Sequence, residues 1–168
     1  KGEDLRANLK VRLEDVVSDE KVEAVFPSGK RLAIKLPAGV EDGQTIRLRG
    51  QGQPAPVPAG QPGDALVTIE FMRHPRFEID GRDLKMELSV PVETAVLGGK
   101  LPIETLDGRI ALTLPAWSNA GKTLRLKGKG LTQADGGRGD LLVLVRIVLP
   151  AEPDETLTEL FRARETTG

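Results

Sequence analysis

The chain has 168 residues, which is enough for one ordinary domain or two small ones. Its formal net charge is −1, whereas a dedicated nucleic-acid or membrane-surface binder would be strongly basic. It has no cysteine and one histidine, so we expect no disulfide, no metal site, no cofactor and no catalytic residues. No apolar run is long enough to span a bilayer, and we expect a cytoplasmic protein without membrane contact.

The N-terminal part of the chain predicts strands. Apolar and polar residues alternate over Leu5–Leu13, as in a strand with one buried and one solvated face. A second strand is predicted over Val22–Phe26 and, after a Pro-Ser-Gly turn, a third over Leu32–Leu36. Residues 15–17 are expected to form a short helical turn.

Two similar segments follow, "GQTIRLRGQG" at residues 43–52 and "GKTLRLKGKG" at residues 121–130. The Gly-Lys-Thr of the second suggests a phosphate-binding loop, but the first glycine of that motif would fall at Ala116. Both segments instead alternate as strands, and their glycines indicate tight turns or bulges. The basic residues are predicted to form a solvated face; they are Arg47, Arg49, Arg125 and Lys127.

Between and beyond these segments, single residues suggest structural roles. His74 lacks an obvious nucleophile, so we expect it to order the turn at Pro75 rather than to catalyse a reaction. Residues 94–98 predict a short helical turn, and Asp107–Gly108 lies between alternating runs, as in a type I′ hairpin. Trp117 is near a turn and is expected to pack.

Three sequence blocks occur twice in the same order, which indicates two copies of one small domain. They begin at Asp4 and Asp83, at Leu36 and Leu114, and at Gly63 and Gly139. We therefore predict an all-β chain of two tandem, homologous β-sandwich-like domains and a short C-terminal helix. The predicted boundaries are 1–73 for the first copy, 74–150 for the second and 151–168 for the tail.

Matched positions in the two copies suggest sites. Asp64 and Asp140 each follow a glycine, and we expect them to cap backbone amides at a strand entrance. In the first copy, Ala7 and Ala24 lie beside larger apolar residues and would leave a shallow trough. An extended peptide would fit along such a strand edge. The same pattern also fits ordinary core packing.

The repeated blocks resemble the C-terminal substrate-binding region of DnaJ/Hsp40 co-chaperones, particularly the zinc-less type that includes curved-DNA-binding protein A. The motifs include "IKLPAGVEDGQTIRLRGQG", "GDALVTIEFMRHPRFEIDGRDL" and "GDLLVLVRIVLP", and the resemblance covers residues 4–150. It implies that the chain holds unfolded polypeptides for Hsp70. The sequence has no His-Pro-Asp motif of a J domain, so this chain by itself is not expected to activate Hsp70.

The resemblance also implies site residues. A hydrophobic peptide site on the first domain would fall on Ala7, Leu9, Ala24, Phe26 and Val67. Relatives dimerise through a C-terminal helix, which here begins after Asp154 and would use Leu157, Leu160 and Phe161. The alternatives are a DNA-binding module of the curved-DNA-binding type, which would use Arg47 and Arg49, and a structural spacer. The net charge makes DNA the less favoured partner.

Overall fold

A computed structural model of the chain describes the backbone of residues 1–167 and the side chains of residues 1–165. Contacts between Cα atoms divide the chain into two compact units. Unit 1 comprises Lys1–Met86, Glu104–Gly108 and Arg125–Leu142, and unit 2 comprises Glu87–Ile103, Arg109–Leu124 and Val143–Gly168. Because this division runs through the second sequence copy, the domain boundary after residue 73 stays a prediction.

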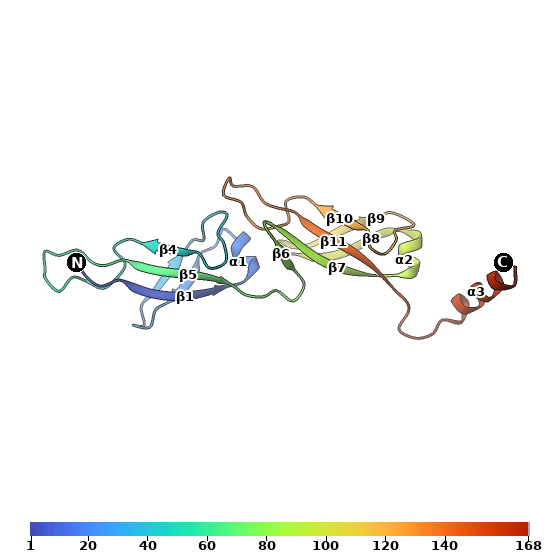
Figure 1. Cartoon of the computed structure of the whole chain (residues 1–168), viewed down its shortest axis with the longest axis horizontal. Coiled ribbons are helices and arrows are strands. Elements are labelled where there is room, and N and C mark those ends of the chain that lie inside the picture. The colour runs from blue at the N-terminus through green and yellow to red at the C-terminus, as the bar shows by residue number, and fades with distance from the viewer. Residues whose placement is uncertain (168) are drawn as a thin grey trace. The chain divides into compact units, whose positions relative to one another are not determined.

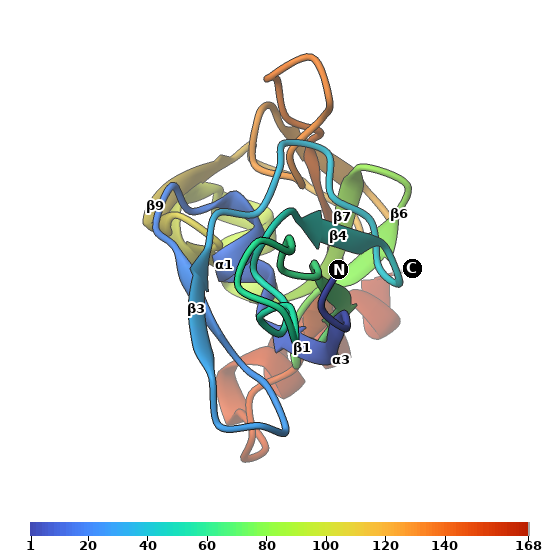
Figure 2. The ribbon, with the colours of Figure 1, turned by 90° about the vertical axis from the view of Figure 1, so that its left-hand side faces the viewer.

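Strands dominate the first copy (Figure 1). In chain order its elements are β1 (Leu5–Val11), α1 (Leu13–Val17), β2 (Val22–Val25), β3 (Arg31–Ile34), β4 (Thr45–Leu48) and β5 (Ala65–Phe71). Three strands form a sheet in the order β1-β5-β4, in which β5 is parallel to β1 and antiparallel to β4. The β2–β3 pair is an antiparallel hairpin, and Figure 2 shows it on one side of this sheet.

The second copy repeats this arrangement. Its elements are β6 (Glu78–Asp80), β7 (Asp83–Pro91), α2 (Val92–Leu97), β8 (Gly99–Thr105), β9 (Gly108–Leu114), β10 (Thr123–Leu126) and β11 (Leu141–Val148). The sheet order is β10-β11-β7-β6, and β8 pairs with β9. Strands β7, β11 and β10 thus correspond to β1, β5 and β4. The predicted all-β class, both short helices and the C-terminal helix α3 (Glu155–Thr167) are confirmed.

The first strand is shorter than predicted, because a helix begins at its end. The Arg12 N–H donates a hydrogen bond to Asp15 Oδ2 at 3.0 Å, and the Arg12 guanidinium reaches Oδ1 at 3.2 Å. An acidic side chain in the first turn of a helix stabilises that turn. Leu13 therefore lies on α1 rather than on β1, and it remains buried in the core.

Each unit has its own buried interior. Alternate residues of a strand point to the same face of a sheet, and in unit 1 the central strand β5 contributes three residues that are fully buried. The buried apolar residues of unit 1 include Val11, Ala24, Phe26, Ile34, Ala65, Val67 and Ile69. The core cluster of unit 2 contains Val90, Ala95, Leu114 and Val145. The β2–β3 hairpin therefore closes one face of the first sheet.

Two predictions about turns are wrong. A type I′ turn needs positive φ at both central residues, but of the pair Asp107 and Gly108 only the glycine has it, with φ of 116°. Thr105 orders the hairpin instead: its Oγ1 accepts from the Asp107 N–H at 3.1 Å and donates to the Gly108 carbonyl at 2.7 Å. Trp117 does not pack, since 80% of its surface is exposed, and its φ is 59°.

Candidate functional site

The residues predicted to contact a peptide fall into two groups. Ala7 and Leu9 lie on β1 and are half-buried. Val67 lies opposite Ala7 on β5, and it exposes 0% of its surface. Ala24 on β2 and Phe26 just after it expose 1% and 2%. Three of the predicted residues are therefore part of the core, and only Ala7 and Leu9 present apolar surface to solvent.

Further half-buried apolar residues continue the surface made by Ala7 and Leu9. Leu5 lies on the same face of β1, and Val22 lies on β2, which contacts β1. Sequence reasoning did not assign these two residues to the site, although their alternation with polar residues was visible. We call the half-buried residues Leu5, Ala7, Leu9 and Val22 the β1–β2 surface.

The strands under the β1–β2 surface each have an unpaired edge. β1 is the outer strand in the order β1-β5-β4, and β2 pairs only with β3 among the described residues. The corresponding strand of the second copy differs, because β6 pairs with the first part of β7. Lys85 on β7 also forms an ion pair with Asp80 on β6, with 3.3 Å between Nζ and Oδ2. The first copy thus leaves open a strand edge that the second copy partly covers.

Side-chain size also distinguishes the copies at matched positions. Ala7 in the first copy corresponds to Met86 in the second, and Ala24 corresponds to Ile103. Phe26 corresponds to Thr105, whose hydroxyl is hydrogen-bonded within its turn. The first copy therefore has the smaller side chain at two of these three positions, Ala7 and Ala24, and the larger one at Phe26.

Each copy places an aspartate at the entrance to its central strand. The Gly50 N–H donates to Asp64 Oδ1 at 2.9 Å, and the Gly128 N–H donates to Asp140 Oδ1 at 3.0 Å. The backbone amides of the two aspartates donate in turn to the carboxylates of Asp4 and Asp83, both at 2.7 Å. This confirms the prediction that the two aspartates cap backbone amides.

Both aspartates also form ion pairs with arginine side chains. The pKa of Asp64 lies below its ordinary value of 3.8 because of the glycine amide, which outweighs burial, and because of nearby cations. The pKa of Asp140 is lowered by its glycine amide and by a hydrogen bond from Arg125, again against burial. Arg47 Nε lies 3.3 Å from Asp64 and Arg125 Nη1 lies 2.7 Å from Asp140. These two arginines were predicted to form only a solvated face. They also pair with the aspartates that precede the central strands β5 and β11.

The last glycines of the "RGQG" and "KGKG" segments allow two backbone segments to lie close together. The Gly52 N–H donates to the Gly63 carbonyl at 2.8 Å, and a Cβ on Gly52 would lie 2.5 Å from the carbonyl carbon of Gly63. Gly130 has the same relation to Gly139, with a hydrogen bond of 2.8 Å. No side chain fits at these positions, so the glycines are required by the turn and not by a phosphate. The longer loop of the first copy, residues 53–62, begins and ends at this pair.

His74 orders the segment that follows β5. Its Nδ1 accepts from the Arg76 N–H at 3.1 Å, so its Nε2 carries the proton and donates to Glu14 Oε2 at 3.2 Å. The ring lies 4.6 Å from that of Phe77, centroid to centroid. No nucleophile is among these partners, and the arrangement agrees with the structural role that we expected for His74.

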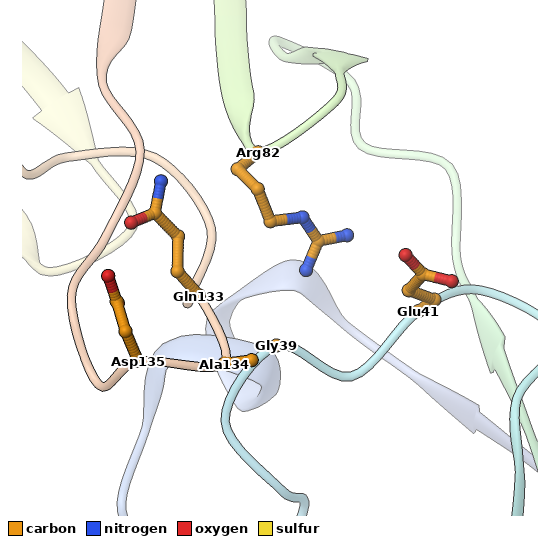
Figure 3. A pocket seen from close by; sticks show the side chains of 6 residues that line it. All are labelled: Gly39, Glu41, Arg82, Gln133, Ala134 and Asp135. Carbon is orange, nitrogen blue, oxygen red and sulfur yellow. The ribbon is translucent and has the colours of Figure 1, made fainter.

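One cavity of unit 1, of about 410 Å³, is lined by four polar side chains, one glycine and one alanine (Figure 3). Its lining residues are Gly39, Glu41, Arg82, Gln133, Ala134 and Asp135. Arg82 Nη1 donates to the carbonyls of Val40 and Thr132, at 3.1 and 3.0 Å. The guanidinium thus joins two loops that are far apart in sequence, a role that no sequence pattern indicated. The cavity combines one arginine with two carboxylates.

The tail helix is capped as expected, but its apolar residues are open. Asp154 Oδ1 accepts from the Leu157 N–H at 3.0 Å, which satisfies a free amide of the first turn. Leu160 and Phe161 expose 49% and 58% of their surface, and Leu157 is half-buried. Dimerisation through these residues stays a prediction.

No helix within residues 1–167 combines the length and the apolar character that a membrane crossing needs. Over the same part of the chain, His, Cys, Asp and Glu side chains form no group of three or more that would hold a metal ion.

The fold and the site define a class of protein: a tandem β-sheet scaffold with an open strand edge beside half-buried apolar residues. The family described as "DnaJ C terminal domain" matches residues 5–150. This chain belongs to that family.

Curated relatives carry two kinds of name. The chain is 38% identical over 175 residues to the "Curved DNA-binding protein" of Pseudomonas syringae, covering 96% of this chain and 55% of the relative. It is 40% identical over 175 residues to "Chaperone protein DnaJ 2" of Thermus thermophilus, covering 98% and 59%. It is 41% identical over 139 residues to "Chaperone protein DnaJ" of Deinococcus proteolyticus, covering 83% and 43%. The chain thus spans about half the length of these relatives.

Proposed function

We propose that this chain binds extended segments of non-native polypeptides on the β1–β2 surface and presents them to Hsp70. The observation that carries the proposal is the open edge of β1 beside half-buried Ala7 and Leu9, in contrast to β7, whose first three residues pair with β6. Membership of the DnaJ C-terminal family supports a co-chaperone role. Presentation to Hsp70 rests on the family alone.

The geometry suits recognition by strand addition. A client segment in extended conformation would form backbone hydrogen bonds with the free edge of β1. Every second client side chain would then point toward Leu5, Ala7 and Leu9, because side chains alternate along a strand. The small side chain of Ala7 leaves room between its two leucine neighbours. Backbone bonds are independent of client sequence, so this mode tolerates many clients.

Binding at one such surface would be weak. Burial of one leucine- or phenylalanine-sized side chain contributes roughly 1.5–3 kcal/mol. A dissociation constant of about 1 mM corresponds to about −4.1 kcal/mol, so one or two inserted side chains hold a client only loosely. Two chains joined through α3 would raise the apparent affinity by about 10²–10⁴-fold for a client that reaches both. Weak single contacts allow the client to be released.

The proposal is tested by filling or charging the β1–β2 surface. We expect Leu9→Asp and Ala7→Met to raise at least tenfold the concentration of this chain that suppresses aggregation of a chemically denatured client, measured by light scattering. Aspartate would repel apolar side chains, and methionine would occupy the space beside Leu5 and Leu9. Substitutions of Phe26 are unsuitable, because Phe26 is buried and an aspartate there would disrupt the core.

The second copy provides the control. Leu88 corresponds to Leu9 and is half-buried as well, so Leu88→Asp makes the same chemical change on β7. Circular dichroism and thermal melting establish that each variant is folded. If folded Leu9→Asp and Ala7→Met protect the client as well as the parent chain does, or if Leu88→Asp loses protection equally, the β1–β2 surface is not the client site.

A second candidate function is DNA binding by the outer face of the first sheet. Arg6 and Lys10 point away from the apolar row on β1, are exposed, and form no ion pair within residues 1–165. Lys85, the second-copy counterpart of Arg6, is paired with Asp80. Exposed cations on one face of a sheet suit contacts with phosphates, and several relatives are named curved DNA-binding proteins.

For the DNA candidate, the test is the salt dependence of binding to a duplex. Each lost phosphate contact lowers the slope of log K against log salt by roughly 0.9. We expect Arg6→Ala with Lys10→Ala to lower that slope by roughly 2, and Lys85→Ala to leave it unchanged. Substitution of Arg47 is a poorer test, because Arg47 also anchors Asp64. Equal slopes for all variants would reject this face as the DNA contact.

A further inference from the structure

The turn at Gly39 in the first copy is held by residues of the second copy. The Gly39 N–H donates a hydrogen bond to Thr132 Oγ1 at 3.1 Å. A Cβ on Gly39 would lie 2.6 Å from the backbone nitrogen of Ala134, so only glycine lets these two loops lie this close together. Val40, the next residue, exposes 1% of its surface. All of these residues belong to unit 1, in which a loop of the second copy therefore seals a turn of the first.

Arg82, which precedes β7, adds a third element to this contact. Its Nη1 donates to the carbonyls of Val40 and Thr132, at 3.1 and 3.0 Å, so one guanidinium binds both loops at once. Figure 3 shows its side chain between the loop that carries Glu41 and the loop that carries Gln133. Hydrogen bonds from a charged donor are stronger than those from a neutral one. The two loops are thus joined by side-chain bonds as well as by close backbone packing.

The repeat shows that this contact is not part of the fold that the copies share. Arg82 corresponds to Glu3 in the first copy, and Gly39 corresponds to Trp117 in the second. The turn at Trp117 has a φ of 59° and leaves 80% of that side chain exposed. The second copy nevertheless forms the same sheet as the first. The contact at Gly39 therefore serves the junction of the two copies, because a single sheet forms without it.

The segment that connects the copies is attached to the first copy as well. The Met72 N–H donates to the Val11 carbonyl at 2.8 Å, and His74 Nε2 donates to Glu14 Oε2 at 3.2 Å. A connecting segment alone would leave the copies free to turn about it, as domains joined by a short linker do. The contact made by Arg82 lies on other elements. A second attachment at a different place removes the rotation that the connecting segment alone would allow.

We propose that Gly39, Arg82 and Thr132 form a latch that fixes the first copy to the base of the second copy. Residues 1–86 and 125–142 then move as one body, as their grouping in unit 1 suggests. The latch consists of hydrogen bonds, which hold one orientation because they depend on direction as well as on distance. Its opening would let the β1–β2 surface turn relative to the start of β7. The inference is independent of client binding and of DNA binding.

A pair of spin labels tests the latch, and the chain has no cysteine that would interfere with labelling. Glu20→Cys and Lys127→Cys place one label on each copy, at exposed positions within unit 1. Double electron–electron resonance then measures the distribution of distances between the labels. We expect one narrow distribution in the otherwise unchanged chain. Arg82→Met should roughly double its width, because methionine keeps the apolar stem and removes the donors that bind both loops.

Amide hydrogen exchange, followed by NMR, gives a second readout at the latch itself. The Gly39 amide should exchange at least tenfold faster in Arg82→Met, because its acceptor on Thr132 is no longer held in place. The Gly52 amide, which donates to the Gly63 carbonyl within the first copy, should exchange as before. Thr132→Val is the second variant, since it removes only one hydroxyl and tests the latch even if Arg82→Met does not fold. It should widen the distance distribution as well.

Lys30→Met is the matched control. Lys30 Nζ also donates to a backbone carbonyl, that of Gln51 at 2.8 Å, but this bond lies within the first copy. The variant should change neither the distances nor the exchange of Gly39, and circular dichroism establishes that each variant is folded. Three outcomes would overturn the proposal: a broad distribution in the parent chain, a narrow one in folded Arg82→Met and Thr132→Val variants, and a Lys30→Met variant that broadens it equally.

Discussion

The two copies build the same sheet from matching sequence blocks, but they leave different parts of it uncovered. In the first copy the edge of β1 is open beside small side chains, and the turn at Gly39 is packed. In the second copy β6 pairs with β7, larger residues replace the alanines, and the turn at Trp117 is exposed. Two copies of the same fold can therefore differ in function, because each copy exposes a surface that is covered in the other.

The two copies should differ most in the stability that each loses when Phe26 or its counterpart Thr105 is replaced by alanine. Phe26→Ala removes a buried aromatic ring and should lower the free energy of unfolding by about 3–5 kcal/mol. Thr105→Ala removes two hydrogen bonds of the β8–β9 hairpin and should cost about 1–2 kcal/mol. Urea denaturation of both variants measures the difference. Equal losses would mean that the two hairpins are stabilised in the same way, contrary to the comparison drawn above.

A smaller difference in stability loss is expected between alanine substitutions in the matched turns at Gly39 and Trp117. Gly39→Ala forces positive φ on a residue with a Cβ and brings that atom against the backbone of Ala134, which should cost about 2–4 kcal/mol. Trp117→Ala keeps a non-glycine residue in the same conformation and removes only exposed atoms, so the change should stay within about 0.5 kcal/mol. Thermal melting compares the two, at a concentration where the chain is monomeric. A destabilising Trp117→Ala would show that the indole packs within its own chain.

The smallest effect on stability is expected from Asp64 and Asp140, the aspartates that occupy the same position in both copies. The pKa values of Asp64 and Asp140 are lower in the folded chain than their ordinary value of 3.8, so the unfolded chain binds more protons in acid. Their contribution to stability is therefore complete above about pH 5 and is lost as the pH falls through the folded pKa. Asn at either position keeps an oxygen that accepts from the glycine amide but removes the charge.

We expect Asp64→Asn and Asp140→Asn each to lower the melting temperature slightly at pH 7 and to flatten its fall between pH 5 and the acid range. The double variant should combine both changes, since the sites lie in different copies. A melting temperature that falls with acid as steeply in the double variant as in the parent chain would show that other carboxylates, such as Glu14 beside His74, control the acid response.

Most of the fold could be predicted from sequence because the information is local or repeated. Alternation gives the strands, and the aspartate caps appear twice at matched positions. The site was harder. Periodicity marks Leu9 and Phe26 alike as inward-facing, but only the packing of the hairpin decides that Phe26 is sealed and Leu9 is not. The cover that β6 gives to β7 rests on a three-residue strand with one apolar side chain, too short for a pattern.

Contacts between residues far apart in the sequence could not be predicted either. Arg82 binds carbonyls 42 and 50 residues away in sequence, and nothing near it in sequence signals those partners. Trp117 was expected to pack because large aromatic residues usually do. Its turn instead leaves 80% of its surface exposed.

The closed base of the loop at residues 53–62 has a practical consequence. Hydrogen bonds from Gly52 to Gly63 and from Gly63 to Gln53 tie the two ends of the loop together, whatever lies between them. Lengthening a flexible loop costs only about 0.6 kcal/mol for each doubling. A fluorophore, an affinity tag or a whole reporter domain inserted near Pro56 would therefore leave the sheet undisturbed, and it would allow single molecules of this protein to be observed.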